Sequence, residues 1–305
     1  MARVLVTGGA GFIGSHLVDA LQEKGHRVVV LDDLSSGHRE NLSSQTELVR
    51  DDIRSPRVHD LFRDMRPEFV FHLAAQKNVR ESLKNPLHDA EINIQGSLQL
   101  IALSQKFAVK KFIFSSTGGA MYGDVRNLPT KETTPAHPTT PYGIAKYTVE
   151  QYLEVYAREY GVKSAILRYA NVYGPRQDPH GEAGVISIFC DAIQRGEPMT
   201  IFGDGKQTRD YIYVSDVVEA NMLAMQRNVQ TDINIGTGVK TSVVKLTEVL
   251  KKVSGKRAKV KHRAAIAAEV RKSALDVKLA KKYLGWKPTV SLLDGLEKTW
   301  EDYRS

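Results

Sequence analysis

The chain has 305 residues, 42% of them hydrophobic, which is enough to bury a large core in one large domain or two unequal ones. Lysine and arginine outnumber the acidic residues by 43 to 35, a net charge of +8, but only the stretch from Lys251 to Lys272 concentrates basic residues. That stretch has no interleaved aromatic residue and matches no nucleic-acid-binding module, so we expect no nucleic-acid partner, whereas the charge suits an anionic small substrate.

The first 117 residues alternate short apolar runs with helical stretches. The apolar runs cover residues 3–7, 26–31, 68–75 and 110–116, and the expected helices cover residues 12–24, 58–65 and 87–107. Strands that are apolar almost throughout predict a parallel sheet covered on both faces by helices. The chain enters its first strand without a charged leader, and no apolar run approaches membrane-spanning length, so we expect neither a secretory signal nor a membrane partner.

A glycine-rich turn follows the first predicted strand. Gly8, Gly11 and Gly14 fall where this strand turns into a helix, and a backbone without Cβ atoms can approach a pyrophosphate there. Asp32 ends the second predicted strand eighteen residues after Gly14. A carboxylate at that place accepts hydrogen bonds from the adenosine ribose and repels a 2′-phosphate, so the sequence predicts NAD rather than NADP.

Tyr142 and Lys146 stand four residues apart at the start of a helix predicted to end at Gly161. This spacing puts both side chains on one helical face, so the ammonium can lower the pKa of the phenol and make it a base. Poising a tyrosine near neutral pH takes about 4 kcal/mol. One cation at about 4 Å supplies this at an effective dielectric of about 20 but not in open water, so the pair must be partly buried. A similar pair, Tyr283 and Lys287, has Gly285 between its members and is not expected to act.

The second half of the chain changes texture. Residues 164–172 read as a buried strand, and glycine-rich and proline-rich loops follow from about Tyr173. The single cysteine, Cys190, lies in an apolar run, which favours a core position and a reducing, cytoplasmic compartment. Histidines without zinc-type spacing indicate no metal site. We predict an α/β fold with a doubly wound parallel-sheet Rossmann domain at 1–172, to which 209–238 return, and a smaller mixed α/β substrate lobe at 173–208 and 239–305.

An ordered set of segments resembles the extended short-chain dehydrogenase/reductase family, most closely its UDP-glucose 4-epimerases. The segments span nearly the whole chain and include TGGAGFIG, DDLSSG, HLAAQ, FSSTGGAMYG, PYGIAK, LRYANVYGPRQD, FGDGKQTRDYIYVSDV, NIGTG and LGWKP. The resemblance implies an isomerase of galactose metabolism that interconverts UDP-glucose and UDP-galactose through a 4-keto intermediate, with tightly bound NAD. It also implies a homodimer formed by helices 87–107 and 142–160, although the apolar stripes of these helices could instead be buried within one chain.

The resemblance assigns site residues by position. Tyr142 would be the catalytic base, Thr117 its hydroxyl partner, and Lys146 the ligand of the nicotinamide ribose. The residues implied to bind the cofactor are Gly8, Gly11, Phe12, Ile13, Gly14, Asp32, Leu34, Ser35, Ser36, Gly37, Asp52, Ile53, Leu73, Ala74, Ala75, Lys77, Asn93, Ser115, Tyr142, Lys146 and Tyr169. Those implied to bind the UDP-sugar are Thr117, Asn171, Val185, Thr200, Phe202, Arg209, Glu269 and Ser273.

The chain departs from the family pattern where Ile266 replaces a second phosphate-binding arginine, whose role Arg263 or Arg271 could take. Gly118 and Gly119 stand where related dehydratases and decarboxylases carry acidic residues. Ser273, a small residue, would admit an N-acetyl group on the sugar. The alternatives are therefore an epimerase of UDP-N-acetylglucosamine or UDP-glucuronate, or a redox-sensing or scaffold protein that binds NAD without turnover.

Overall fold

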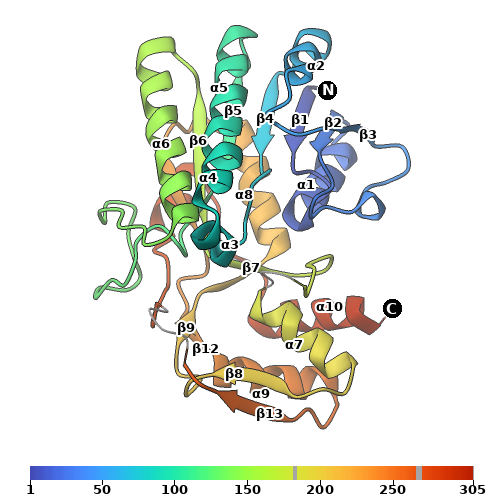
Figure 1. Ribbon diagram of the computed structural model, residues 1–305, viewed down its shortest axis with the longest axis vertical. Coiled ribbons are helices and arrows are strands. Elements are labelled where there is room, and N and C mark those ends of the chain that lie inside the picture. The colour runs from blue at the N-terminus through green and yellow to red at the C-terminus, as the bar shows by residue number, and fades with distance from the viewer. Residues whose placement is uncertain (181–183, 266–269, 305) are drawn as a thin grey trace.

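A seven-stranded parallel sheet forms the centre of the larger part of the molecule (Figure 1). The computed structural model describes residues 1–180, 184–265 and 270–304. The strand order is β11-β6-β5-β4-β1-β2-β3, so the chain reverses direction of winding between β1 and β4. The strands are β1 (Arg3–Thr7), β2 (Arg27–Asp32), β3 (Glu47–Arg50), β4 (Phe69–His72), β5 (Lys111–Thr117), β6 (Ser164–Tyr169) and β11 (Asp232–Ile235). The predicted doubly wound α/β fold is confirmed.

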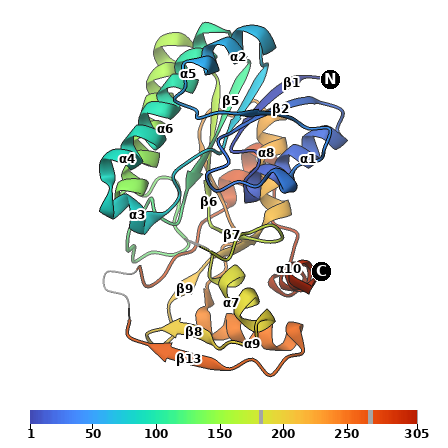
Figure 2. The same ribbon diagram turned by 45° about the vertical axis from the view of Figure 1, so that its right-hand side comes forward.

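Helices cover both faces of this sheet because the strand side chains alternate between them. Val4 and Val6 of β1 join a core cluster with α1 (Phe12–Glu23) and α8 (Val214–Gln226), whereas Leu5 joins the cluster on the opposite face. That opposite face is covered by α2 (Arg57–Met65), α5 (Ser97–Lys106) and α6 (Pro141–Tyr160) (Figure 2). Helix α6 ends at Gly161, which has φ +68°, as the sequence predicted.

The long helix expected between Leu87 and Phe107 is a succession of three helical segments. These are α4 (Pro86–Ala90), the π-helical segment η2 (Glu91–Gly96) and α5. The widened turn brings Gly96 so close to Ile53 that a Cβ on the glycine would lie 2.6 Å from Ile53 Cδ1. Apolar periodicity cannot reveal such a local change of winding, because it is decided by tertiary packing.

Three further details differ from the expectation. The edge strand β3 was not predicted, since it carries only two apolar residues and is not fully buried. The short helix α3 (Val79–Lys84) was not predicted either. The strand expected over residues 164–172 is interrupted at Ala170, after which β7 (Asn171–Tyr173) leaves the sheet.

The smaller lobe lies at the carboxyl ends of the sheet strands (Figure 1). It contains β8 (Met199–Phe202), which pairs in parallel with β13 (Val260–Arg263), and the helices α7 (Val185–Gln194), α9 (Val243–Ser254) and α10 (Leu292–Arg304). Two short pairings lie between it and the sheet: β7 with β10 (Tyr211–Tyr213), and β9 (Thr208–Arg209) with β12 (Thr241–Ser242). The short segments η1 (Arg39–Asn41) and η3 (Ala280–Leu284) complete the fold. The domain boundaries named from the sequence stay a prediction.

Cys190 lies on α7 and is fully buried, as expected of a core residue. Burial raises the pKa of its thiol to about 12, so it is not a nucleophile at neutral pH. None of the helices in the described ranges is long and apolar enough to span a membrane.

Candidate active site

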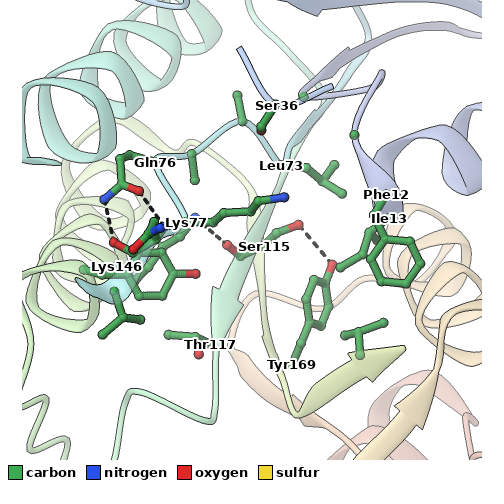
Figure 3. Close-up of a pocket in the computed structure, with 18 of the residues that line it drawn as sticks. Phe12, Ile13, Ser36, Leu73, Gln76, Lys77, Ser115, Thr117, Lys146 and Tyr169 are labelled. Atoms are coloured by element: carbon green, nitrogen blue, oxygen red, sulfur yellow. Dashed lines mark hydrogen bonds between the residues drawn. The ribbon is translucent and has the colours of Figure 1, made fainter. Parts of the chain in front are cut away.

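A cavity of ≈ 1690 Å³ lies at the carboxyl ends of the sheet strands, and Val185 and Ile186 of α7 in the smaller lobe also line it. Figure 3 shows some of the residues that line it. Parallel α/β sheets bind their ligands at this edge. The volume exceeds the roughly 300–1,000 Å³ typical of one small ligand, so there is room for a dinucleotide and a second molecule. The predicted residues that line it are Gly8, Gly11, Phe12, Ile13, Gly14, Asp32, Ser35, Ser36, Gly37, Asp52, Ile53, Leu73, Ala74, Ala75, Lys77, Ser115, Thr117, Tyr142, Lys146, Tyr169, Asn171, Val185 and Arg209.

The turn between β1 and α1 has the shape that a pyrophosphate requires. Gly8 has φ +70°, a conformation that strongly favours glycine, and a Cβ on Gly14 would lie only 2.1 Å from the carbonyl oxygen of Gly8. Helix α1 starts after Gly11, and no side chain caps its first N–H groups. These amides and the helix dipole therefore face the cavity available for an anionic group, so the residues fit a dinucleotide.

Asp32 is held rigidly at the end of β2. Its carboxylate accepts hydrogen bonds from the backbone N–H groups of Ala10 and Leu34, both at 2.9 Å. Burial raises the pKa of Asp32, and these two hydrogen bonds oppose the shift. Each carboxylate oxygen keeps further acceptor capacity, which suits the hydroxyls of a ribose. Leu34 does not line the cavity itself; its backbone orients Asp32.

Tyr142, Lys146 and Thr117 all line the cavity. Helix α6 begins at Pro141, and the hydroxyl of Thr140 accepts the N–H of Gly143 at 3.2 Å, which places Tyr142 in the first turn. Lys146 Nζ lies 6.0 Å from the centre of the Tyr142 ring and donates a 2.9 Å hydrogen bond to the carbonyl oxygen of Ser115. The hydroxyl of Thr117 accepts the N–H of Ala120 at 3.2 Å. The burial that the tyrosine–lysine pair needs is present, because Lys146 is only 4% exposed.

The charge of Lys146 depends on two carboxylates that sequence reasoning missed. Burial lowers the pKa of Lys146 to about 8, and the negative charges of Asp89 and Glu150 oppose this shift. Glu150 follows Lys146 by four residues on α6, so the helical spacing could have revealed it. Asp89 comes from α4 and accepts hydrogen bonds from the side chains of Gln76 and Asn93, both at 2.9 Å. No local sequence pattern predicts that Asp89 lies near Lys146.

Tyr169 lines the cavity on the side of Ser115 that is opposite Lys146 (Figure 3). Its hydroxyl contacts Ser115 Oγ at 3.0 Å and Asn221 Nδ2 at 2.8 Å. Burial raises the pKa of Tyr169 to about 12, so this tyrosine stays protonated at neutral pH. Tyr169 is thus a wall of the site rather than a second base.

Some predicted site residues do not line the cavity: Asn93, Thr200, Phe202 and Ser273, besides Leu34. The amide of Asn93 is bonded instead to Gln76, at 2.9 Å to its N–H and 2.8 Å to its carbonyl oxygen, and so supports the loop after β4. Ser273 is half-buried, and its N–H is bonded to the carbonyl oxygen of Thr208. Glu269 and Ile266 lie outside the described residues.

The two arginines proposed to replace the missing one do not reach the cavity. Arg271 lies 3.5 Å from the carboxylate of Asp204, and Arg263 is exposed at the end of β13. Val270, the residue before Arg271, lines the cavity. Within the described ranges, Arg209 is thus the arginine that lines the cavity on the side of the smaller lobe.

Fold and site together define a dinucleotide-binding enzyme of the doubly wound α/β class. A family model described as the NAD dependent epimerase/dehydratase family matches residues 4–236, and the chain belongs to this family. The family resemblance seen in the sequence and the NAD cofactor are thereby confirmed.

The chain is similar over its whole length to named relatives. It is 45% identical over 97% of its length to a putative UDP-glucose 4-epimerase of Methanocaldococcus jannaschii, of which it covers 96%. The crystal structure of a UDP-glucose 4-epimerase from Thermotoga maritima with UDP-glucose is 53% identical, with a TM-score of 0.97 and coverage of 99% and 98% of the two chains. A UDP-N-acetylglucosamine 4-epimerase from Methanobrevibacter ruminantium is 35% identical, with a TM-score of 0.95 and coverage of 99% and 98%.

Proposed function

We propose that this chain is a cytoplasmic, homodimeric UDP-sugar 4-epimerase that interconverts UDP-glucose and UDP-galactose. The observation that carries the proposal is one cavity that joins the glycine turn, the Tyr142–Lys146 pair and Arg209. The similarity to proteins named UDP-glucose 4-epimerase supports it. An NAD-binding sensor or scaffold would not need the base, its lysine and Thr117 in one place.

The residues around the reacting carbon have distinct tasks. NAD, when bound, supplies an acceptor for a hydride and returns it. Tyr142 takes the proton of the sugar 4-hydroxyl, and the Lys146 ammonium stabilises the phenolate. The Thr117 hydroxyl already accepts a hydrogen bond from Ala120, so its own hydrogen is directed elsewhere and can be donated to the sugar 4-oxygen. Lys146 itself is held by the carbonyl oxygen of Ser115.

Arg209 and Asn171 are proposed to hold the diphosphate of UDP. The planar fork of an arginine binds a phosphate through two charge-assisted hydrogen bonds, which a lysine cannot do. Asn171 lines the cavity from β7, next to the chain segment that carries Arg209. The reaction has no net oxidation, so the keto intermediate must be reduced again in the same site. Anchoring the UDP part keeps this intermediate from leaving while the sugar turns over.

The two glycines that follow Thr117, Gly118 and Gly119, support epimerisation over dehydration or decarboxylation, since neither supplies the acidic side chain that the related enzymes carry there. A Cβ on Gly119 would lie 3.9 Å from both Thr117 Oγ1 and Asn171 Oδ1, so a side chain there would enter the sugar region. Glycine places no proton donor in that space. A Cβ on Gly118 would lie 2.5 Å from Leu275 Cδ1, so that position is closed by packing.

The proposal is tested by denaturing the purified protein and quantifying released NAD and NADP, and by incubating it with UDP-sugars and resolving the products. We expect bound NAD and interconversion of UDP-glucose and UDP-galactose. UDP-N-acetylglucosamine and UDP-glucuronate are included as the alternative substrates. NADP as the main nucleotide would contradict the role of Asp32, and turnover of neither UDP-glucose nor UDP-galactose would contradict the proposed substrate.

A further inference from the structure

Asp210 is a buried carboxylate outside the cavity that binds two distant segments of the chain. It lies between β9 and β10 and is 1% exposed. Its Oδ1 accepts hydrogen bonds from the N–H of Thr237 at 2.8 Å and from the hydroxyl of the same residue at 2.6 Å. Its Oδ2 accepts the N–H of Gly238 at 2.9 Å and that of Leu275 at 3.1 Å. A carboxylate with four donors is fully engaged, so its position is fixed.

Asp210 is connected to residues that line the cavity, one by the chain and one by a backbone hydrogen bond. The preceding residue is Arg209, and the backbone carbonyl oxygen of Asp210 accepts the N–H of Asn171 at 2.9 Å. Both of these neighbours line the cavity. On the other side, Leu275 packs against Gly118, the residue that follows Thr117. Asp210 therefore connects the side proposed to hold the diphosphate with the side that carries the hydroxyl of Thr117.

The approach of the loop after β11 is close enough to exclude a side chain. A Cβ on Gly236 would lie 2.7 Å from Asp210 Oδ2, so only glycine lets this loop reach the carboxylate without a shift. Thr237 and Gly238 are 27 and 28 residues from Asp210, and Leu275 is 65 residues away. The three contacts thus depend on tertiary structure and not on any local turn.

We propose that Asp210 is a positioning residue for substrate binding. It sets the distance between the Arg209–Asn171 side and the Thr117 side of the cavity, and so sets the affinity for the UDP part of the substrate without touching it. This inference rests on the proposed function, because it takes UDP to be the group that Arg209 and Asn171 bind.

Asp216 offers a matched control. It is 3% exposed, and it has counterparts of three of the four donors of Asp210: the N–H of a threonine, Thr289, at 3.0 Å, the hydroxyl of that threonine at 2.7 Å, and the N–H of the next residue, Val290, at 3.1 Å. Asp216 ties the first turn of α8 to a segment away from the cavity, since none of these three residues lines it. Replacing either aspartate therefore removes similar bonds, but only Asp210 lies between the two walls of the site.

The test compares Asp210→Asn and Asp216→Asn by calorimetric titration with UDP, with NAD content, thermal stability and steady-state kinetics measured on the same samples. An asparagine places an N–H₂ group where Asp210 now accepts backbone N–H groups, so part of the junction opens. We expect Asp210→Asn to raise the Kd for UDP and the KM for the UDP-sugar by about tenfold to a hundredfold, with much smaller changes in kcat and NAD content. Asp216→Asn should lower the Tm but leave the Kd for UDP near that of the wild type.

A second pair of variants keeps the test decisive if Asp210→Asn does not fold. Thr237→Val and Thr289→Val each remove the hydroxyl hydrogen bond to the aspartate, and Thr237→Val also removes the acceptor of the Val239 N–H. Only Thr237→Val should weaken UDP binding. A normal Kd in folded Asp210→Asn or, failing that, in Thr237→Val overturns the inference, as does an equal loss in the matched Asp216 or Thr289 variant. Absence of UDP binding to the wild type would instead refute the proposed function, and the inference with it.

Discussion

Tyr142 and Tyr169 line the same cavity but have different surroundings. Tyr142 lies beside the Lys146 ammonium, whereas the hydroxyl of Tyr169 is bonded to Ser115 and Asn221. We predict that Tyr142→Phe lowers the epimerisation rate by about a hundredfold to ten-thousandfold, since it removes only the group that exchanges the proton. Tyr169→Phe should have a much smaller effect on kcat. Steady-state assays and circular dichroism of both variants check this, and near-normal turnover in folded Tyr142→Phe would refute the mechanism.

Lys146 makes the stability of the protein depend on pH above neutrality. Burial holds its folded-state pKa at about 8, below the ordinary value for a lysine. Between about pH 8 and 10 the unfolded chain therefore binds more protons at this residue than the folded chain, so the stability contributed by Lys146 rises with pH.

The measurement is urea unfolding of NAD-stripped wild type and Lys146→Met at pH 7.5 and 9.5. We predict that the free energy of unfolding of the wild type, relative to the variant, rises by roughly 2 kcal/mol between these values. A difference that stays constant would show that Lys146 has its ordinary pKa in the folded protein, and a difference that falls would show that its folded-state pKa is raised; either result contradicts the prediction.

At the scale of the elements, a buried ion pair joins α6 to β6. Arg168 of β6 and Glu150 of α6 are 7% and 2% exposed and approach within 2.5 Å, and Glu150 also accepts the hydroxyl of Ser116 at the end of β5. The strand β5, which ends in Thr117, and the helix α6, whose first turn contains Tyr142, are therefore held together behind the site. Asp232 of β11 binds the same guanidinium at 2.7 Å.

We predict that Arg168→Leu lowers the free energy of unfolding by about 3–5 kcal/mol, because it leaves Glu150 as an uncompensated buried charge. Adding Glu150→Leu should restore part of the loss, since a neutral pair has no charge to desolvate. Arg158→Leu, which removes an exposed arginine of the same helix, serves as the control and should leave stability close to the wild-type value. Urea unfolding of the wild type and the three variants measures their free energies of unfolding. A double variant less stable than Arg168→Leu would contradict the electrostatic explanation.

At the scale of the whole molecule, an outward apolar stripe on α6 is the candidate dimer surface. Ile144, Tyr152 and Val155 are exposed and follow one another at helical spacing, and Leu87 is exposed on neighbouring α4. The apolar stripes that the sequence shows on these helices are Ile92, Ile94, Leu98 and Ile101, and Val149, Leu153 and Tyr156. Of these, Ile101, Val149 and Leu153 are buried in the core of the monomer. The part of the two helices that remains open to a partner is thus a different set of side chains.

We predict that the protein is a homodimer through this surface and that Tyr152→Glu converts it to a monomer, because a charge would be buried unpaired in the contact. Ile188→Glu, at an exposed apolar position on α7, should leave the dimer intact. Sedimentation velocity distinguishes the species. A monomeric wild type, or a dimer that survives Tyr152→Glu, would exclude α6 as the interface.

Much of the cofactor side of the site could be predicted from the sequence because its parts lie within one strand–turn–helix–strand unit. Gly8 and Gly14 contact each other, and Asp32 bonds to Ala10 and Leu34, all inside the first 34 residues. Backbone conformation and helical spacing are local properties, and motifs report them. The same holds for Tyr142 and Lys146, whose shared face follows from four residues of helix.

Tertiary structure alone decided the features that depend on contacts between distant segments. The bond from Asp210 to Leu275 spans 65 residues, Arg168 meets Glu150 across the interface between strand and helix, and Asp89 reaches the Lys146 site from α4. A buried carboxylate is tolerated only where the fold brings donors to it, and no local pattern records where those donors come from. For this reason the chain alone determined the fold class and the cofactor and predicted the Tyr142–Lys146 pair, whereas the supports that hold the two sides of the site together became visible only in three dimensions.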